Sequence, residues 1–183
     1  MRWGVTWLLI CYVQFIWSQP DIFTIDLGNI SFTSNAPLEI IKAKSVRLRG
    51  VIDISKGTFG LTVPITSFEG FNNPLQKTHF NENYMESNKY PNATFRGKII
   101  ENIDFSVPGL FNIRAKGNLE IHGIGRERII KGTIDIKENQ LEISSNFQVL
   151  LQEHEISIPK IVYQKIAEEI EVSINARLVR TYQ

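Results

Sequence analysis

Strict two-residue alternation of apolar and polar side chains is the feature that most constrains what this chain can fold into. It runs through most of the chain after residue 20 and is clearest over residues 111–123, where apolar and small residues occupy the odd positions. This period fits a β-strand, whose successive side chains point to opposite faces, and it does not fit the 3.6-residue period of a helix. Strands with one apolar face are typical of antiparallel sheets that bury that face. We therefore expect an all-β protein.

Eight or nine short strands are expected, separated by turn residues. Their ranges are 22–26, 30–33, 46–54, 59–65, 93–99, 111–123, 130–136, 141–149 and 170–178. Ser55, Lys56 and Gly57 form a hairpin turn, because glycine adopts positive φ without strain. So many short antiparallel strands in roughly 165 residues predict a sandwich or a closed barrel.

Two segments depart from the alternation. Residues 68–91 contain several asparagines and two prolines and predict a long loop with one or two short helical turns. Loops of this length inside a compact domain are commonly lids or binding elements. Residues 158–170 instead place isoleucine and valine at helical spacing, with Pro159 near the start, where its missing N–H costs least. This second segment predicts a short C-terminal helix.

The N-terminal residues are typical of an export signal. Arg2 precedes an apolar stretch from Trp7 to Trp17, which is shorter than the ~20 residues of a spanning helix. We expect a cleaved signal peptide over residues 1–18, and one domain over residues 19–183 in a periplasmic or secreted protein. Removal of the leader would also remove Cys11, the one cysteine, so no disulfide or cysteine metal site is expected.

Charge and motifs argue against several classes of function. Lysine and arginine together number 20 against 19 acidic residues, and Arg2 belongs to the leader, so the mature chain is neutral. A nucleic-acid binder would carry a basic excess, and none is expected here. His79, His122 and His154 are scattered, and no cluster predicts a metal ion. We predict no catalytic residue, no metal and no cofactor.

The predicted inner face combines large apolar side chains with small ones. The small residues are Gly50, Ala93, Gly97, Ala115, Gly117, Gly123, Gly132 and Ala176. Glycines let barrel strands bend and coil, which is one explanation. The other is volume, since an eight-stranded barrel is either just filled by its own side chains or holds one slim ligand. Any cavity would be apolar, so its ligand would be a hydrocarbon chain.

Thirteen apolar residues are predicted to line such a tunnel or its mouth. They are Phe59, Leu61, Val63, Phe68, Phe71, Phe80, Phe95, Phe111, Ile113, Leu119, Ile121, Phe147 and Val149. Phe68, Phe71 and Phe80, which belong to the long loop, either pack on the barrel end as part of the core or line the mouth of the cavity as a hydrophobic gate. The two roles are compatible. Each buried methylene contributes ~0.8 kcal/mol, so a five-carbon isoprene unit would contribute roughly 3–4 kcal/mol before the cost of binding.

A series of short motifs resembles the YceI-like family. They are Gly50–Asp53, Gly57–Phe59, Pro64–Phe68, Lys77–Phe80, Glu82–Met85, Lys89–Phe95 and Gly117–Gly123, within a similarity spanning residues 23–178. The resemblance implies an eight-stranded antiparallel, lipocalin-like barrel that encloses a polyisoprenoid-type lipid in a periplasmic or secreted protein. Together with the patterns above, it predicts this barrel with one short C-terminal helix and a long lid loop.

Other functions stay open at this point. A barrel filled by its own side chains would instead be a structural or interaction module that docks a protein partner. An outer-membrane barrel would turn the apolar side chains toward lipid and the charged ones inward. An enzyme would rest on His79 and nearby carboxylates. The sequence also leaves the oligomeric state open, a homodimer included.

Overall fold

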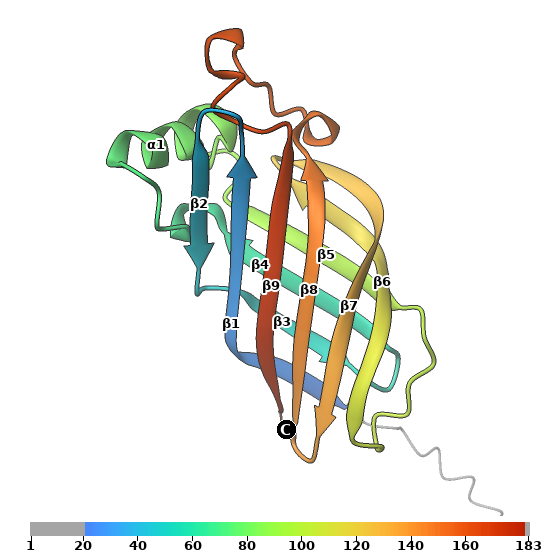
Figure 1. Ribbon diagram of the computed structural model, residues 1–183. Helices are drawn as coiled ribbons and strands as arrows, with labels where there is room; N and C mark the ends of the chain where they lie inside the picture. Colours follow the sequence, from blue (N-terminus) through green and yellow to red (C-terminus); the bar gives the residue numbers. More distant parts are fainter. Residues whose placement is uncertain (1–20, 182–183) are drawn as a thin grey trace, which may run out of the picture.

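The computed structural model describes residues 21–181, which form a single closed antiparallel sheet (Figure 1). Its strands are β1 (Ile22–Asn35), β2 (Ile40–Ser45), β3 (Arg49–Asp53), β4 (Thr58–Pro64), β5 (Asn92–Ile99), β6 (Gly109–Ile121), β7 (Ile124–Lys137), β8 (Gln140–Leu150) and β9 (Glu169–Arg180). Consecutive strands from β3 to β9 pair as neighbours, and β1 pairs with β9 to close the barrel. The leader expected over residues 1–18 lies outside the described residues.

The nine strands occupy eight positions around the barrel. The end of β1, Ile30–Asn35, pairs with β2, and its beginning, Ile22–Thr24, pairs with β3, while β9 takes the other edge. β2 and β3 are therefore two parts of one interrupted strand, and the expected eight-stranded antiparallel barrel is confirmed. The apolar residues of the alternating pattern face its interior.

The interruption between β2 and β3 changes which side chains face inward. Ser45 and Leu48 are both buried although they are three residues apart, and Val46 between them is 69% exposed. The hydroxyl of Ser45 accepts a hydrogen bond from the backbone N–H of Arg47 at 3.0 Å, which turns the chain here. One unbroken strand over residues 46–54, as the sequence pattern predicts, would place Val46 on the inner face with Leu48, and the break after Ser45 makes this prediction wrong.

The N-terminal strands also differ from the prediction. The two strands expected over residues 22–26 and 30–33 are one strand, β1, with a register shift between Ile25 and Leu27. This bulge admits one extra residue while the strand continues along β9. β2 was not predicted, although Ile41, Ala43 and Ser45 alternate there with lysines.

The short helix lies in the loop and not near the C-terminus. The α-helix of the described chain, α1, spans Pro74–His79, and a π-helical turn follows over Phe80–Tyr84. The expected C-terminal helix is reduced to a 3₁₀ turn at Lys160–Val162. A helix of that length needs a packed apolar face for stability, and Ile161, in the middle of the turn, is 91% exposed.

The β3–β4 turn forms as the sequence predicted. Gly57 has a φ of 65°, and the Asp53 carboxylate accepts hydrogen bonds from the backbone N–H groups of Ser55 at 3.1 Å and Lys56 at 3.3 Å. The hydrogen bond from the Ser55 hydroxyl and the adjacent Lys56 ammonium hold the pKa of Asp53 below its usual value. This turn lies at the barrel end opposite α1 (Figure 1).

Candidate functional site

A cavity of about 410 Å³ occupies the half of the barrel next to α1. Its wall is built mainly from apolar side chains of β1, β5, β6, β8 and β9, together with the segment of residues 68–91, here called the lid, and residues 151–170. Lining side chains include Ile30, Phe32, Ile65, Phe68, Phe80, Met85, Ala93, Ile121, Phe147, Ile156, Ile166 and Val172. The volume is within the range of small-molecule binding pockets.

Four phenylalanines form one wall of this cavity. Phe32 comes from β1, and Phe68, Phe71 and Phe80 come from the lid. The ring centroid of Phe32 lies 5.4 Å from that of Phe68 and 5.3 Å from that of Phe80, and the Phe71 and Phe80 centroids are 5.1 Å apart. Such distances are typical of favourable aromatic pairs. The lid aromatics thus pack on the barrel and line the cavity at the same time.

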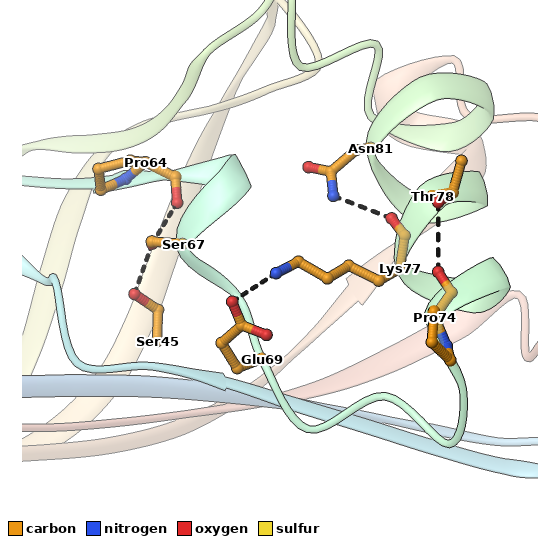
Figure 2. A network of polar contacts seen from close by, with 8 residues as sticks. All are labelled: Ser45, Pro64, Ser67, Glu69, Pro74, Lys77, Thr78 and Asn81. Atoms are coloured by element: carbon orange, nitrogen blue, oxygen red, sulfur yellow. Dashed lines mark hydrogen bonds and ion pairs between the residues drawn. The ribbon is translucent and has the colours of Figure 1, made fainter.

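Polar contacts hold the lid against the barrel, as Figure 2 shows. The Ser67 hydroxyl donates to the carbonyl of Pro64 and accepts from the Ser45 hydroxyl at 2.6 Å, which joins the entry of the lid to the end of β2. Lys77 of α1 forms an ion pair with Glu69 within the lid, and the backbone of Glu69 pairs with that of Lys44 in β2. These contacts fix the lid where β2 and β4 do not pair with each other.

The lid helix is defined by its own sequence. Asn73 accepts a hydrogen bond from the backbone N–H of Gln76 at 2.9 Å and so caps α1, and Pro74 occupies the first helical position. The backbone N–H of Met85 donates to the carbonyl of Phe80 at 2.9 Å, which closes the π-helical turn. The wider turn directs Phe80, Tyr84 and Met85 into the cavity wall.

Polar side chains lie around the rim of the cavity. Glu39, Asn73, Gln76, His79 and Lys165 contribute to its lining. The Glu39 carboxylate accepts a hydrogen bond from the Gln76 side chain at 2.6 Å, which joins the β1–β2 turn to α1. A ligand with an apolar chain and a polar end could therefore place its chain inside and its polar end at this rim.

The other half of the barrel is filled by its own side chains. A void of about 70 Å³ remains there. The rings of Phe59 and Phe95 pack at 4.9 Å, and Ile134, Leu141 and Leu178 are fully buried in the same half. No comparable space for a ligand exists among these side chains.

Close contact between strands explains the inner-face glycines at this narrow half. Gly97 of β5 pairs with Gly117 of β6. A Cβ on Gly97 would lie 2.0 Å from the carbonyl oxygen of Lys116, and one on Gly117 would lie 2.3 Å from that of Arg96. The geometric explanation for this pair is therefore correct, and the volume explanation is wrong, because the space is filled by the neighbouring backbone.

The structure places the thirteen predicted lining residues in three groups. Around the large cavity lie Val63, Phe68, Phe71, Phe80, Leu119, Ile121, Phe147 and Val149. Around the small void lie Phe59, Leu61, Phe95 and Ile113, and Phe147 borders both. Phe111 borders neither and packs into the core at the far end, because it sits near the start of β6. A single tunnel along the whole barrel is not present.

Similarity to known proteins agrees with this geometry. The sequence model of the YceI-like domain matches residues 26–178. The chain belongs to the YceI-like family. No curated protein sequence matches it.

Three solved structures have a similar fold at low sequence identity. A polyisoprenoid-binding domain from Saccharophagus degradans, implicated in plant cell wall breakdown, has a TM-score of 0.75 at 12% identity, covering 89% of this chain and 100% of that one. BcnA of Burkholderia cenocepacia has a TM-score of 0.68 at 14% identity, covering 82% and 95%. The YceI protein of Campylobacter jejuni has a TM-score of 0.56 at 16% identity, covering 98% and 94%.

Several residues of this YceI-like cavity were missed by the sequence analysis. They include Ile30, Phe32, Ile41, Ile65, Met85, Ile156, Ile166, Ile170 and Val172. Alternation could have found Phe32 and Ile41, since each faces inward from a strand. No local signal marks Ile156 or Met85, because both lie in irregular segments that other parts of the chain hold in place.

Two histidines near the cavity are more buried than the sequence indicated. The alternation over residues 111–123 predicts His122 on the outer, solvated face, but its ring contacts the Glu86 carboxylate at 2.6 Å and the carbonyl of His154 at 3.1 Å. His154 is fully buried, with Nδ1 3.0 Å from the carbonyl oxygen of Ile124. Burial lowers the pKa of His154 below its usual value.

Two other features are absent from the part of the chain that the structure describes. Within residues 21–181, no group of three or more His, Cys, Asp or Glu side chains is placed to hold a metal ion. The same residues contain no helix of sufficient length and apolar character to span a membrane.

Proposed function

We propose that this YceI-like protein binds a lipid with a long apolar chain in the cavity next to the lid. The observation that carries the proposal is the contrast within one barrel: a cavity of about 410 Å³ with an apolar wall in one half and a packed core in the other. An apolar cavity of this size would be left empty or weakly hydrated without a ligand, and filling it buries hydrocarbon at ~0.8 kcal/mol per methylene.

The shape of the site favours an amphiphile. Its wall is apolar, whereas Glu39, His79 and Lys165 lie at its rim. A hydrocarbon chain would occupy the interior, and a polar or charged end would remain at the rim in contact with water. Affinity would come from the buried chain, and the rim would select among polar ends.

A polyisoprenoid is the lipid class we propose for this chain. The Saccharophagus degradans domain with the similar fold is named as polyisoprenoid-binding, and the chain shares its family fold. Methyl-branched chains suit a wall rich in phenylalanine, isoleucine and valine, because branched groups fill the gaps between rings and β-branched side chains. The far half of the barrel limits how deep such a chain can enter.

We further propose that the protein acts outside the cytoplasm, as the leader-like residues 1–18 indicate. The proposal is a binding function without catalysis. The rival function, a filled barrel that only docks a protein partner, is disfavoured by the cavity itself, since such a barrel would need no empty apolar interior.

Lipid extraction followed by mass spectrometry of the purified protein tests the proposal. We expect a long-chain isoprenoid lipid near a one-to-one ratio, or uptake of one offered in vesicles. Failure to find a bound lipid together with failure to take one up would contradict it.

A matched pair of alanine-to-phenylalanine variants sharpens that test. Ala93 lines the large cavity, and Ala115 lines the small void. Ala93→Phe should reduce lipid content at least tenfold with little loss of stability, because the ring enters open space. Ala115→Phe should instead destabilise the fold by about 1–3 kcal/mol, because it overpacks a filled region. Equal lipid content in wild type and Ala93→Phe would count against binding in this cavity.

A further inference from the structure

Four large apolar side chains are exposed at the end of the barrel where the cavity opens. Leu38 is 66% exposed, Leu75 61%, Ile161 91% and Tyr163 63%. We call these four residues the apolar rim. They come from the β1–β2 turn, α1 and the segment before β9, which are far apart in the sequence and lie together at one end in Figure 1. Clustered exposed apolar residues mark interaction surfaces.

Hydrogen bonds join the three segments of the apolar rim. The backbone N–H of Leu38 donates to the carbonyl of Gln164 at 2.9 Å, and the Gln76 side chain donates to Glu39 at 2.6 Å. The backbone N–H of Ala167 donates to the buried Ser34 hydroxyl of β1 at 2.8 Å. The apolar rim is therefore one surface held in place, and Leu75 belongs both to it and to the cavity lining.

The most protruding part of the apolar rim carries positive charge. Residues 156–167 contain Lys160 and Lys165 and no acidic residue. These lysines flank Ile161 and Tyr163, and the segment projects past the ends of the strands (Figure 1). Apolar residues, a tyrosine and lysines together fit the interface of a bilayer, where phosphate groups meet hydrocarbon.

We propose that the apolar rim docks on the surface of a lipid bilayer, so that the mouth of the cavity faces the membrane. This inference rests on the proposed function, because a lipid taken from a bilayer would then enter the cavity without crossing water. The charge of Lys160 and Lys165 complements lipid phosphates, and the exposed Ile161 and Tyr163 would enter the boundary between headgroups and acyl chains.

A fluorescent probe at each end of the barrel tests the docking. A nitrobenzoxadiazole label is attached to single cysteines made by Ile161→Cys and, as the matched control, Leu110→Cys, both in the full chain carrying Cys11→Ser. Leu110 is 70% exposed at the far end of the barrel. On addition of phosphatidylcholine vesicles, we expect a blue shift and a brighter signal at position 161 and no change at position 110. Both variants share the same N-terminal residues, so these residues cannot produce a difference.

The result at position 161 decides the proposal. An unchanged probe at 161, or the same change at both positions, would overturn it. A blue shift at 161 that depends on protein concentration without vesicles would also overturn it, because the apolar rim would then bind a second copy. Vesicles with a quarter of phosphatidylglycerol should bind up to about 25-fold more tightly, since each of the two lysines near an anionic surface contributes about fivefold.

A double variant separates docking from lipid binding in the cavity. Neither Ile161 nor Tyr163 lines the cavity. Ile161→Ser with Tyr163→Ser should weaken binding to phosphatidylcholine vesicles about tenfold or more and leave the extracted lipid content unchanged. Wild-type protein without any bound lipid would contradict the proposed function. A double variant that keeps its bound lipid and binds vesicles as tightly as the wild type would contradict docking alone.

Discussion

The two halves of the barrel are built from the same alternating strands, yet one is hollow and the other is packed. In the packed half, β3 pairs with β4 and the wall is a continuous ladder. In the hollow half, β2 pairs with β1, and its backbone pairs with the lid through an isolated bridge between Lys44 and Glu69. The lid closes the barrel wall where β2 and β4 do not pair. Because the lid spans a wider gap than one paired strand would, the cavity remains beneath it.

The contrast shows that the cavity depends on how the wall is closed more than on small inner side chains. Gly97 and Gly117 let two strands approach closely in the barrel and so remove space. The aromatic residues Phe68, Phe71 and Phe80 instead stand at the cavity wall because the lid carries them outside the sheet. Large residues therefore border the open half, and the Gly97–Gly117 pair belongs to the closed half.

Truncating one isoleucine in each half gives the largest expected difference. Ile134 is fully buried in the packed half, whereas Ile121 is partly buried and lines the cavity. Ile134→Ala should lower the free energy of unfolding by about 2–5 kcal/mol, because it leaves a new void. Ile121→Ala should cost about 1–2 kcal/mol, because it enlarges existing space. Urea titration measures both, and equal losses would show that the halves are packed alike.

Two glycine variants test the close strand contact of the packed half. Gly97→Ala should destabilise the protein by about 1–3 kcal/mol, since its Cβ would collide with the Lys116 carbonyl. Gly60 is the control, because the nearest atom to its added Cβ is a flexible Arg96 side-chain carbon at 3.9 Å. Gly60→Ala should be neutral or stabilising by up to ~1 kcal/mol. A harmless Gly97→Ala would contradict the contact.

Acidification should lower the free energy of unfolding in two steps, the first caused by a group beside the cavity and the second by a group in the far turn. Burial lowers the folded-state pKa of His154, which lies beside the cavity. Its contribution to the free energy of unfolding therefore falls as the pH drops below about 6.5, because the unfolded chain takes up a proton there and the folded chain does not. The pKa of Asp53, in the far turn, is lowered by the Ser55 hydrogen bond, so its contribution is lost only below about pH 4. Unfolding curves from pH 7 to 3 should show His154→Phe removing the first decline and Asp53→Asn the second. Unaltered slopes in both variants would contradict these assignments.

Sequence alternation was sufficient to predict antiparallel strands that form a sandwich or a barrel, because each strand has one apolar face. The resemblance to the YceI-like family was needed to choose the barrel. Alternation could not locate the interruption between Ser45 and Leu48, because the sequence alternates regularly both before and after these two intervening residues. The prediction of a C-terminal helix was wrong because the helical spacing over residues 158–170 belongs to residues of an irregular segment that line the cavity one by one, such as Val162 and Ile166. Tertiary contacts override a short local pattern.

The cavity was only partly predictable. Inward-facing residues could be identified by parity, but parity does not tell how far a residue lies along the barrel axis. Phe111 and Phe147 share the inner face, yet Phe147 borders the cavity and Phe111 packs at the closed end. Their difference depends on strand stagger and on the lid, which are properties of the assembled barrel.

An electron-density map of the protein purified without organic solvent would show whether a lipid occupies the lid half. We expect elongated density there, in contact with Phe32, Phe80 and Ile121, and protein side chains alone in the far half. A lid half that has collapsed on itself, or that holds only ordered water after growth in lipid-rich cells, would contradict it.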